Sequence, residues 1–286
     1  MFRSIFSLIL LLGLAGAAYL ITHKVKNRGV REEVGKILQD MPDGFSLKWD
    51  DVKYSLYTKE TSLHGVELKV KDSLYSVRMD RVVLIDLDNN FPQVVHFKGE
   101  GLRLNFLGGY PMIAEQLEAL GIDDVPFDIE MSFRYKSREL LIRNLELSAP
   151  DIGKLKLALQ ITNFDIYRVN FAEEVVATDI LQLSLDSADL EFENGGIADR
   201  YITQQARAAG LEPEAWIDDR ANAFATTFGG ADVGYNVALG DALRRFLSKP
   251  DRIEIGAHPS KPVSYVKTIY ARPEEMLELL GITASD

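Results

Sequence analysis

The sequence predicts an α+β fold with an N-terminal transmembrane helix, a curved and mostly antiparallel β-sheet, and C-terminal helices that pack on the sheet. Three observations predict it. An uncharged apolar run fills residues 5–21, a period-two alternation runs from Phe45 to about Glu193, and helical spacing follows residue 195. The predicted domains are a membrane anchor with a basic flank over 1–31, a sheet domain over 32–194, and a helical region with one strand over 195–286.

The apolar run is the first predicted element. Its 17 residues span about 25 Å as a helix, and Lys24 and Lys26 extend that reach by snorkelling. A cleaved signal peptide ending near Ala17 and a buried helix of a soluble protein are the two alternatives. Basic residues after the run favour a cytoplasmic body, whereas a short apolar segment with a charged start is the usual export signal. We expect an uncleaved anchor and a body outside the cytoplasm.

The central part of the chain alternates apolar and polar residues with period two. The first such segment begins at Phe45, and the others include 66–70, 102–106, 129–135 and 155–161. Strands with one apolar and one polar face are typical of antiparallel sheets, because parallel strands covered on both faces read as continuous apolar runs. One segment changes phase: Leu183 and Leu185 are odd, whereas Leu190 is even. This change predicts a β-bulge near Ser187–Asp189.

The last third of the chain has the spacing and end signals of helices. Helices are predicted over 197–209, 213–228, 237–247 and 273–280, and a strand over 252–257. The second helix starts at Pro213, which is favoured in a first turn, and stops before Gly229. Since an apolar sheet face has to be covered, we expect these helices to cover it.

Composition excludes several classes of protein. The chain has no cysteine, which excludes disulfide scaffolds, thiol nucleophiles and cysteine-based metal sites. Residues 1–31 carry five basic and no acidic residues, so residues 32–286 hold 27 basic and 43 acidic residues, a net charge of −16. We expect no nucleic-acid partner, because phosphate binding needs clustered Lys and Arg.

No catalytic signature for metal-dependent proteolysis, nucleotide binding or serine hydrolysis occurs in the sequence. His64, His96 and His258 are each predicted to be solvated or hydrogen-bonded, because none has a second ligand at metal-binding spacing. The acidic residues from Asp186 to Glu193 line the polar side of a strand, and alternation alone does not place two of them in one pocket. We therefore predict a protein that is not an enzyme and has no cofactor or metal.

The first 106 residues resemble the opening of the AsmA-like inner-membrane-anchored periplasmic proteins. The residues that carry the resemblance are an N-terminal span, a basic linker, Tyr54–Thr58, Ser62–Leu68 and Val77–Val82. The resemblance implies a curved antiparallel sheet with an apolar groove that handles phospholipid, on a single-pass protein with a periplasmic body. Segments 190–211 and 246–263 are similar to uncharacterised exported proteins of Gram-negative bacteria.

These observations lead to a functional hypothesis. The chain is predicted to be a membrane-anchored periplasmic binding module whose apolar sheet face accommodates lipid or another apolar ligand in envelope maintenance. The alternative is a non-catalytic scaffold with a closed core, tethered at the inner membrane beside other envelope proteins. The expected partners are the membrane through residues 5–21, phospholipid and envelope proteins. The predicted groove residues are Leu47, Trp49, Tyr54, Leu68, Leu104, Met131, Phe133 and Leu157.

Overall fold

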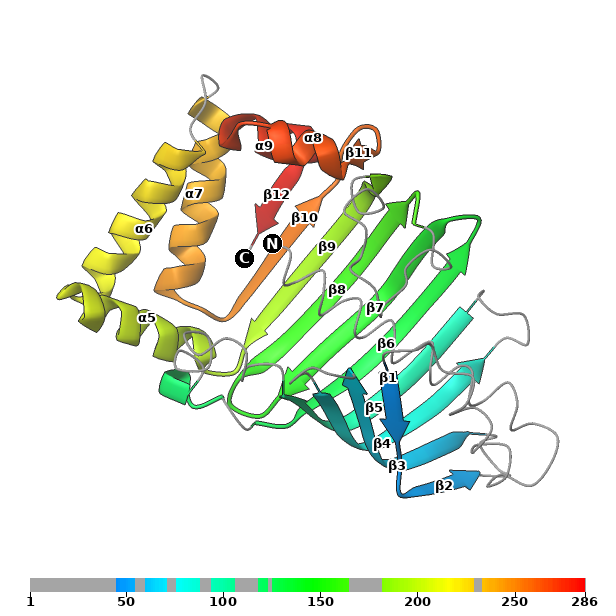
Figure 1. The fold of residues 1–286 in the computed structure, drawn as a ribbon. Helices are drawn as coiled ribbons and strands as arrows, with labels where there is room; N and C mark the ends of the chain where they lie inside the picture. The colour runs from blue at the N-terminus through cyan, green and yellow to red at the C-terminus, as the bar shows by residue number, and fades with distance from the viewer. Residues whose placement is uncertain are drawn as a thin grey trace. The chain divides into compact units, whose positions relative to one another are not determined.

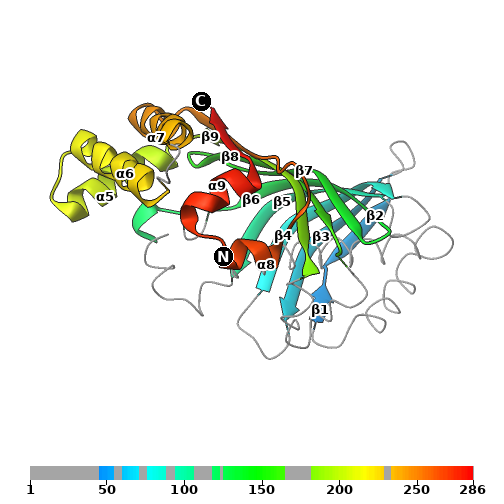
Figure 2. The same ribbon diagram turned by 90° about the horizontal axis from the view of Figure 1, so that it is seen from above.

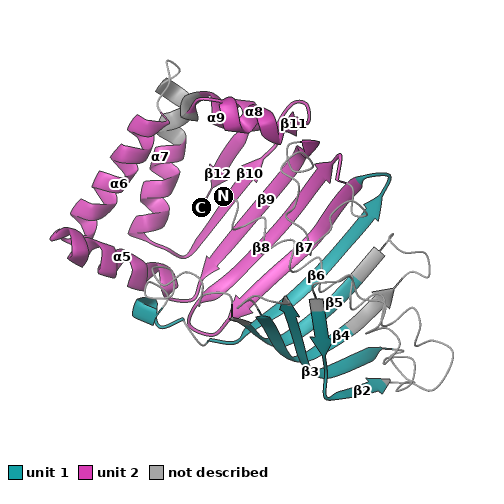
Figure 3. Cartoon of the chain, in the orientation of Figure 1, with its two compact units in different colours: residues 1–138, 165–179 teal, residues 139–164, 180–286 magenta. Residues whose placement is uncertain are grey.

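The fold is described from a computed structural model of the chain (Figure 1). The structure describes residues 45–54, 60–70, 76–87, 94–105, 118–122, 125–164, 182–228 and 233–285. The chain forms two compact units, Met1–Arg138 with Asp165–Asp179, and Glu139–Phe164 with Ile180–Asp286 (Figure 3). We call them unit 1 and unit 2. Unit 2 contains both the C-terminal helices and the strands between residues 139 and 194. The predicted domain boundary at residue 194 instead separates those strands from the helices.

Unit 1 is an antiparallel sheet. Its strands are β1 (Phe45–Lys48), β2 (Asp51–Tyr54), β3 (Thr61–Val70), β4 (Ser76–Leu87), β5 (Val94–Asn105) and β6 (Phe127–Lys136). The strand order is β1-β3-β4-β5-β6, and β2 pairs with the other half of β3. The alternation that predicts these strands also separates the two faces: apolar residues such as Val77 and Met131 are fully buried, whereas Arg78 is exposed.

Two glycines let two strands of unit 1, β3 and β5, change phase. In β3 the buried apolar side chains shift from Leu63 to Val66 across Gly65, which has φ 60°. In β5 they shift from Phe97 to Leu102 across Gly101, which has φ 66°. Glycine adopts this left-handed conformation without the steric cost of a Cβ. The two glycines therefore keep apolar side chains on the buried face along the whole of each strand.

Unit 2 contains a second antiparallel set of strands. They are β7 (Glu139–Ala149), β8 (Gly153–Thr162), β9 (Ser184–Asn194), β10 (Arg252–Ala257), β11 (Val263–Ser264) and β12 (Ile282–Ser285). The order is β7-β8-β9-β10-β12, and β11 pairs with the start of β9. The predicted bulge is confirmed. Leu185 pairs with Ile161 and Ser187 with Gln160, so Asp186 is the extra residue, one position before the predicted range.

The helices of unit 2 are α5 (Ile197–Ala209), α6 (Pro213–Thr227), α7 (Val233–Ser248), α8 (Tyr265–Tyr270) and α9 (Pro273–Leu280). Figure 1 shows α6 and α7 side by side, with α5 across the lower end of α6, and in Figure 2 the three helices again lie together. Ile202 and Ala206 of α5 form a buried cluster with Trp216 and Ile217 of α6. These apolar residues of α5 and α6 therefore pack against each other. Among α5, α6 and α7, the helix with the most extensive contact with a strand is α7, which contacts β12.

The predicted fold class is therefore corrected. The structure is a mostly antiparallel sheet with few helices, and the C-terminal helices do not cover the sheet face as expected. Within the ranges that the structure describes, no helix is both long and apolar enough to cross a bilayer. Residues 5–21, the predicted transmembrane helix and signal-anchor, lie outside those ranges. The fold is accordingly one without a transmembrane helix among its described elements.

Candidate functional site

Most of the predicted groove residues lie in unit 1, and four of them are buried there. Leu47, Leu68, Met131 and Phe133 are at most 2% exposed, and Leu47 pairs directly with Leu68 across β1 and β3. Trp49, between β1 and β2, is partly exposed. Tyr54 ends β2, and Leu104 pairs with Val77, but the side chains of Tyr54 and Leu104 lie outside the described structure.

The eighth predicted residue, Leu157, belongs to a different surface in unit 2. Leu157 pairs with Leu145 of β7 on one side and with Leu190 of β9 on the other, and Leu190 pairs with Ile255 of β10. The cross-strand rows two positions away along the strands, on the same face, are also apolar. We call this surface the apolar face of unit 2; its central residues are Leu155, Leu157, Leu159 and Ile161 of β8, Leu185, Leu190 and Phe192 of β9, and Ile253 and Ile255 of β10.

Exposure differs across the apolar face. On β7, Leu140, Ile142 and Leu145 are buried, with at most 5% of each residue exposed. Their partners on β8, and Leu190 and Ile255 further along the sheet, are all partly exposed. Phe246 of α7 contacts Phe192 edge to face, with ring centroids 6.2 Å apart. The helix therefore covers one end of the face, and the aliphatic side chains of β8 remain accessible to solvent.

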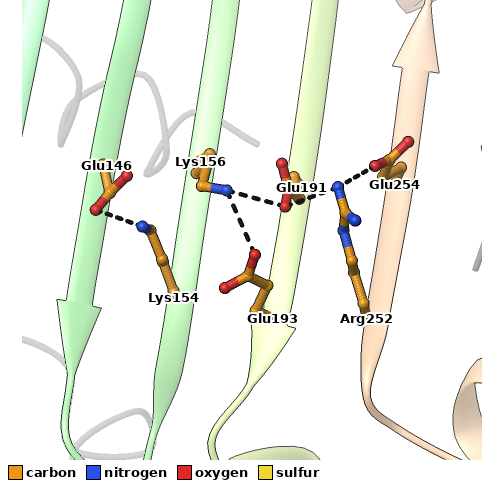
Figure 4. Close-up of polar contacts among 7 residues, drawn as sticks. All are labelled: Glu146, Lys154, Lys156, Glu191, Glu193, Arg252 and Glu254. Atoms are coloured by element: carbon orange, nitrogen blue, oxygen red, sulfur yellow. Dashed lines mark hydrogen bonds and ion pairs between the residues drawn. The ribbon is translucent and has the colours of Figure 1, made fainter.

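The opposite face of the same strands carries a ladder of ion pairs (Figure 4). We call Glu146, Lys154, Lys156, Glu191, Glu193, Arg252 and Glu254 the charged ladder. Lys156 Nζ lies 3.0 Å from Glu191 and 3.4 Å from Glu193, and Lys154 Nζ lies 2.8 Å from Glu146. Arg252 contacts Glu191 at 3.0 Å and also pairs with Glu254. Every cation of the ladder therefore has a carboxylate partner.

The ion pairs of the charged ladder shift the pKa values of Glu191 and Lys156. The hydrogen bond from Lys156 lowers the pKa of Glu191, and the nearby Arg252 guanidinium lowers it further. The same hydrogen bond to Glu191 raises the pKa of Lys156. Both side chains therefore stay charged at neutral pH, as a structural ladder requires.

A polar hollow of about 390 Å³ lies beside the ladder on this face. Its floor is formed by two small residues, Ala158 and Gly256, each of which pairs with Asp189. The hollow is also lined by Arg143, Asn144, Lys156, Leu157, Asp189, Leu190, Glu191, Glu254, Ile255, His258, Thr283 and Ser285.

The described histidines are hydrogen-bonded, as predicted. His64 Nε2 lies 3.4 Å from the Ser62 hydroxyl, His96 Nε2 lies 2.9 Å from Glu130, and His258 Nε2 lies 2.8 Å from Asp189. The described part of the chain holds no group of three metal-ligating side chains. The predicted row of carboxylates is separated: Asp189 bonds His258, whereas Glu191 and Glu193 share Lys156.

Sequence reasoning missed the polar hollow. Its residues come from five strands and a loop, and their meeting depends on the register of β7, β8, β9, β10 and β12. The one local signal is the pair Arg143–Asn144, two consecutive polar residues within the alternation of β7.

Comparison with known proteins adds one match. Residues 146–286, just under half of the chain, match the model of a family described as "Uncharacterized protein". The matched span contains β8 to β12 and all the described helices. Segments 190–211 and 246–263 fall within it. No curated protein sequence matches the chain.

Proposed function

We propose that this chain is a non-catalytic binding module whose apolar face in unit 2 accommodates an apolar ligand, such as the acyl chain of a lipid. One observation carries the proposal. Leu155, Leu157, Leu159 and Ile161 form an uninterrupted aliphatic row along β8, and all four stay partly exposed although the β7 partners of three of them, Leu140, Ile142 and Leu145, are buried.

The dimensions and chemistry of this row suit an extended hydrocarbon. From Leu155 to Ile161 the strand rises about 20 Å at roughly 3.3 Å per residue. An acyl chain in one leaflet spans about 15 Å, half of a hydrocarbon core of about 30 Å. Each methylene that leaves water on this surface contributes about 0.8 kcal/mol. The side chains of the row carry no polar atom, so selectivity would rest on apolar contact and shape.

A fluorescence titration with cis-parinaric acid tests the proposal. We expect saturable binding that Leu157→Gln weakens by about tenfold, which corresponds to about 1.4 kcal/mol. The matched control is Leu211→Gln, because Leu211 is 42% exposed in the loop between α5 and α6, away from the strands. Equal affinity of the two variants would contradict the assignment of the face.

A closed scaffold is the second candidate function, and unit 1 supports it. Leu47, Leu68, Met131 and Phe133 fill the interior of that unit instead of lining an accessible surface. Under this proposal the chain holds envelope proteins together and carries no apolar ligand. Failure of cis-parinaric acid to bind the unmodified chain would favour the scaffold over the binding module.

We also propose that the folded part of the chain works outside the cytoplasm, attached to or near the inner membrane. The charged start and the uncharged apolar run over residues 5–21 are typical of an export signal and support this location. The absence of cysteine is compatible with it, because such a chain needs no oxidative folding step after export.

A further inference from the structure

We propose that the polar hollow of unit 2 is a second binding site, which takes a small anion that also carries hydroxyl groups. This inference goes beyond the proposed function, because the polar side chains that line the hollow lie on the face opposite the aliphatic row. A volume of about 390 Å³ is within the range of small-molecule sites, which is roughly 300–1,000 Å³.

A β-bulge places two polar side chains in the hollow. Ile142 pairs with Leu159 and Leu145 with Leu157, so Arg143 and Asn144 together oppose the single residue Ala158. Bulges redirect side chains and recur beside binding sites. Both Arg143 and Asn144 line the hollow, whereas regular alternation would turn one of them to the apolar face.

Among the described residues of this face, one cation is left for a ligand. Lys154, Lys156 and Arg252 are each paired within the charged ladder, and His258 bonds Asp189. No described residue forms an ion pair or hydrogen bond with the side chain of Arg143, which is exposed at the rim of the hollow. A guanidinium binds carboxylate or phosphate in a two-pronged geometry, so an anionic group suits this position.

The far side of the hollow offers partners for hydroxyl groups. Glu254 accepts from the Ser285 hydroxyl at 3.5 Å, and the carboxylate of Asp189 faces His258. Gly256 keeps the floor open, since a Cβ there would lie 2.8 Å from Thr283 Oγ1 and 2.9 Å from His258 Nε2. Acceptors and hydroxyls on this side match the hydroxyl groups of a ligand whose anionic end meets Arg143 and Asn144.

A nuclear magnetic resonance titration of the full chain tests the inference. The probes are gluconate and glycerol phosphate, and the controls are acetate, which is an anion without hydroxyls, and glycerol, which has no anionic group. We expect gluconate, glycerol phosphate or both to shift the backbone amides of Ala158, Asp189 and Gly256 in a saturable way. The stronger of the two identifies carboxylate or phosphate as the anionic group.

Variants assign the binding to the hollow. Arg143→Gln is expected to weaken the active probe at least tenfold, whereas Arg207→Gln, an exposed arginine in the last turn of α5, leaves the affinity unchanged. Ala158→Leu fills the floor and is expected to weaken binding without removing a charge. No saturable shift with either probe, or equal affinity in Arg143→Gln, would overturn the inference. Leu155→Gln changes the aliphatic row at a residue that does not line the hollow, and it is expected to leave anion binding intact. Failure here is therefore distinguishable from failure of the apolar site.

Discussion

Single residues decide where the strands of unit 1 change phase. Gly65 and Gly101 have positive φ, and the carboxylates of Asp50 and Asp80, respectively, occupy the positions that their Cβ atoms would take. Gly210 has a similar φ of 68° but no atom within 4 Å of such a Cβ. Substitutions at these three glycines therefore distinguish the conformational cost of a side chain at positive φ from the cost of a steric clash.

We predict that Gly65→Ala destabilises the protein by about 3 kcal/mol, because an alanine there has both an unfavourable φ and a clash with Asp50. Gly210→Ala should cost only about 1 kcal/mol from φ. Chemical denaturation measures both. Equal losses in the two variants would show that Asp50 has no part in the requirement for glycine.

Acid should weaken the charged ladder at Glu191. Its pKa is lowered in the folded state by Lys156 and Arg252. A carboxylate with a lowered folded pKa contributes stability above its unfolded value of about 4.5, and that contribution is lost as the pH falls through the folded pKa.

Thermal melts from neutral pH to below pH 4 should therefore show a smaller loss of stability for Glu191→Gln than for the unmodified chain. Glu278→Gln on α9, an exposed residue outside the ladder, is the control and should follow the unmodified chain. The same acid profile for Glu191→Gln and the unmodified chain would exclude a stabilising role for this pair.

At the scale of elements, α7 packs against α6 on one side and against strands β9 and β12 on the other. Phe246 is 9% exposed and contacts Phe192 of β9, whereas Phe228 at the end of α6 is partly exposed and contacts Phe224. Phe246→Ala should cost about 3 kcal/mol, within the usual range for a buried phenylalanine. Phe228→Ala should cost about 1 kcal/mol or less. Denaturant midpoints at a constant slope measure both, and a smaller loss for Phe246→Ala would contradict the packing described.

The elements with strong local signals could be predicted from the sequence. Segments 197–209, 252–257 and 273–280 coincide with α5, β10 and α9, because proline or glycine marks the ends of each. The structure also has α8, β11 and β12, which the sequence does not predict. These elements have only six, two and four residues, too few to establish a period.

The position of the helices and the candidate sites could not be predicted, for a different reason. An apolar stripe on α5 indicates that the helix packs against another element. In the structure this element is α6, whose Trp216 and Ile217 contact the stripe, and not a strand of the sheet. Likewise the period-two pattern gives each strand an apolar face, but it does not distinguish buried Met131 from partly exposed Leu157. Register and burial arise from tertiary pairing, which a single strand pattern does not contain.

At the scale of the whole molecule, the absence of cysteine allows a direct test of location. A single cysteine introduced as Leu211→Cys would sit at an exposed position. If the folded part lies outside the cytoplasm, a membrane-impermeant maleimide should label this cysteine in intact spheroplasts as fully as in lysed ones. Labelling only after lysis would place the folded part in the cytoplasm.

The two units differ in how they expose their apolar residues. Unit 1 has a closed apolar interior, and unit 2 presents an aliphatic row on one face of its strands and ion pairs with a polar hollow on the other. The central claim is that the aliphatic row of β8 binds an apolar ligand.

Native mass spectrometry of the purified protein tests this claim most directly. We expect an adduct with the mass of a lipid on the unmodified chain and on Leu211→Gln, and its loss from Leu157→Gln. A chain that never carries such an adduct, or an adduct that Leu157→Gln retains in full, would contradict it.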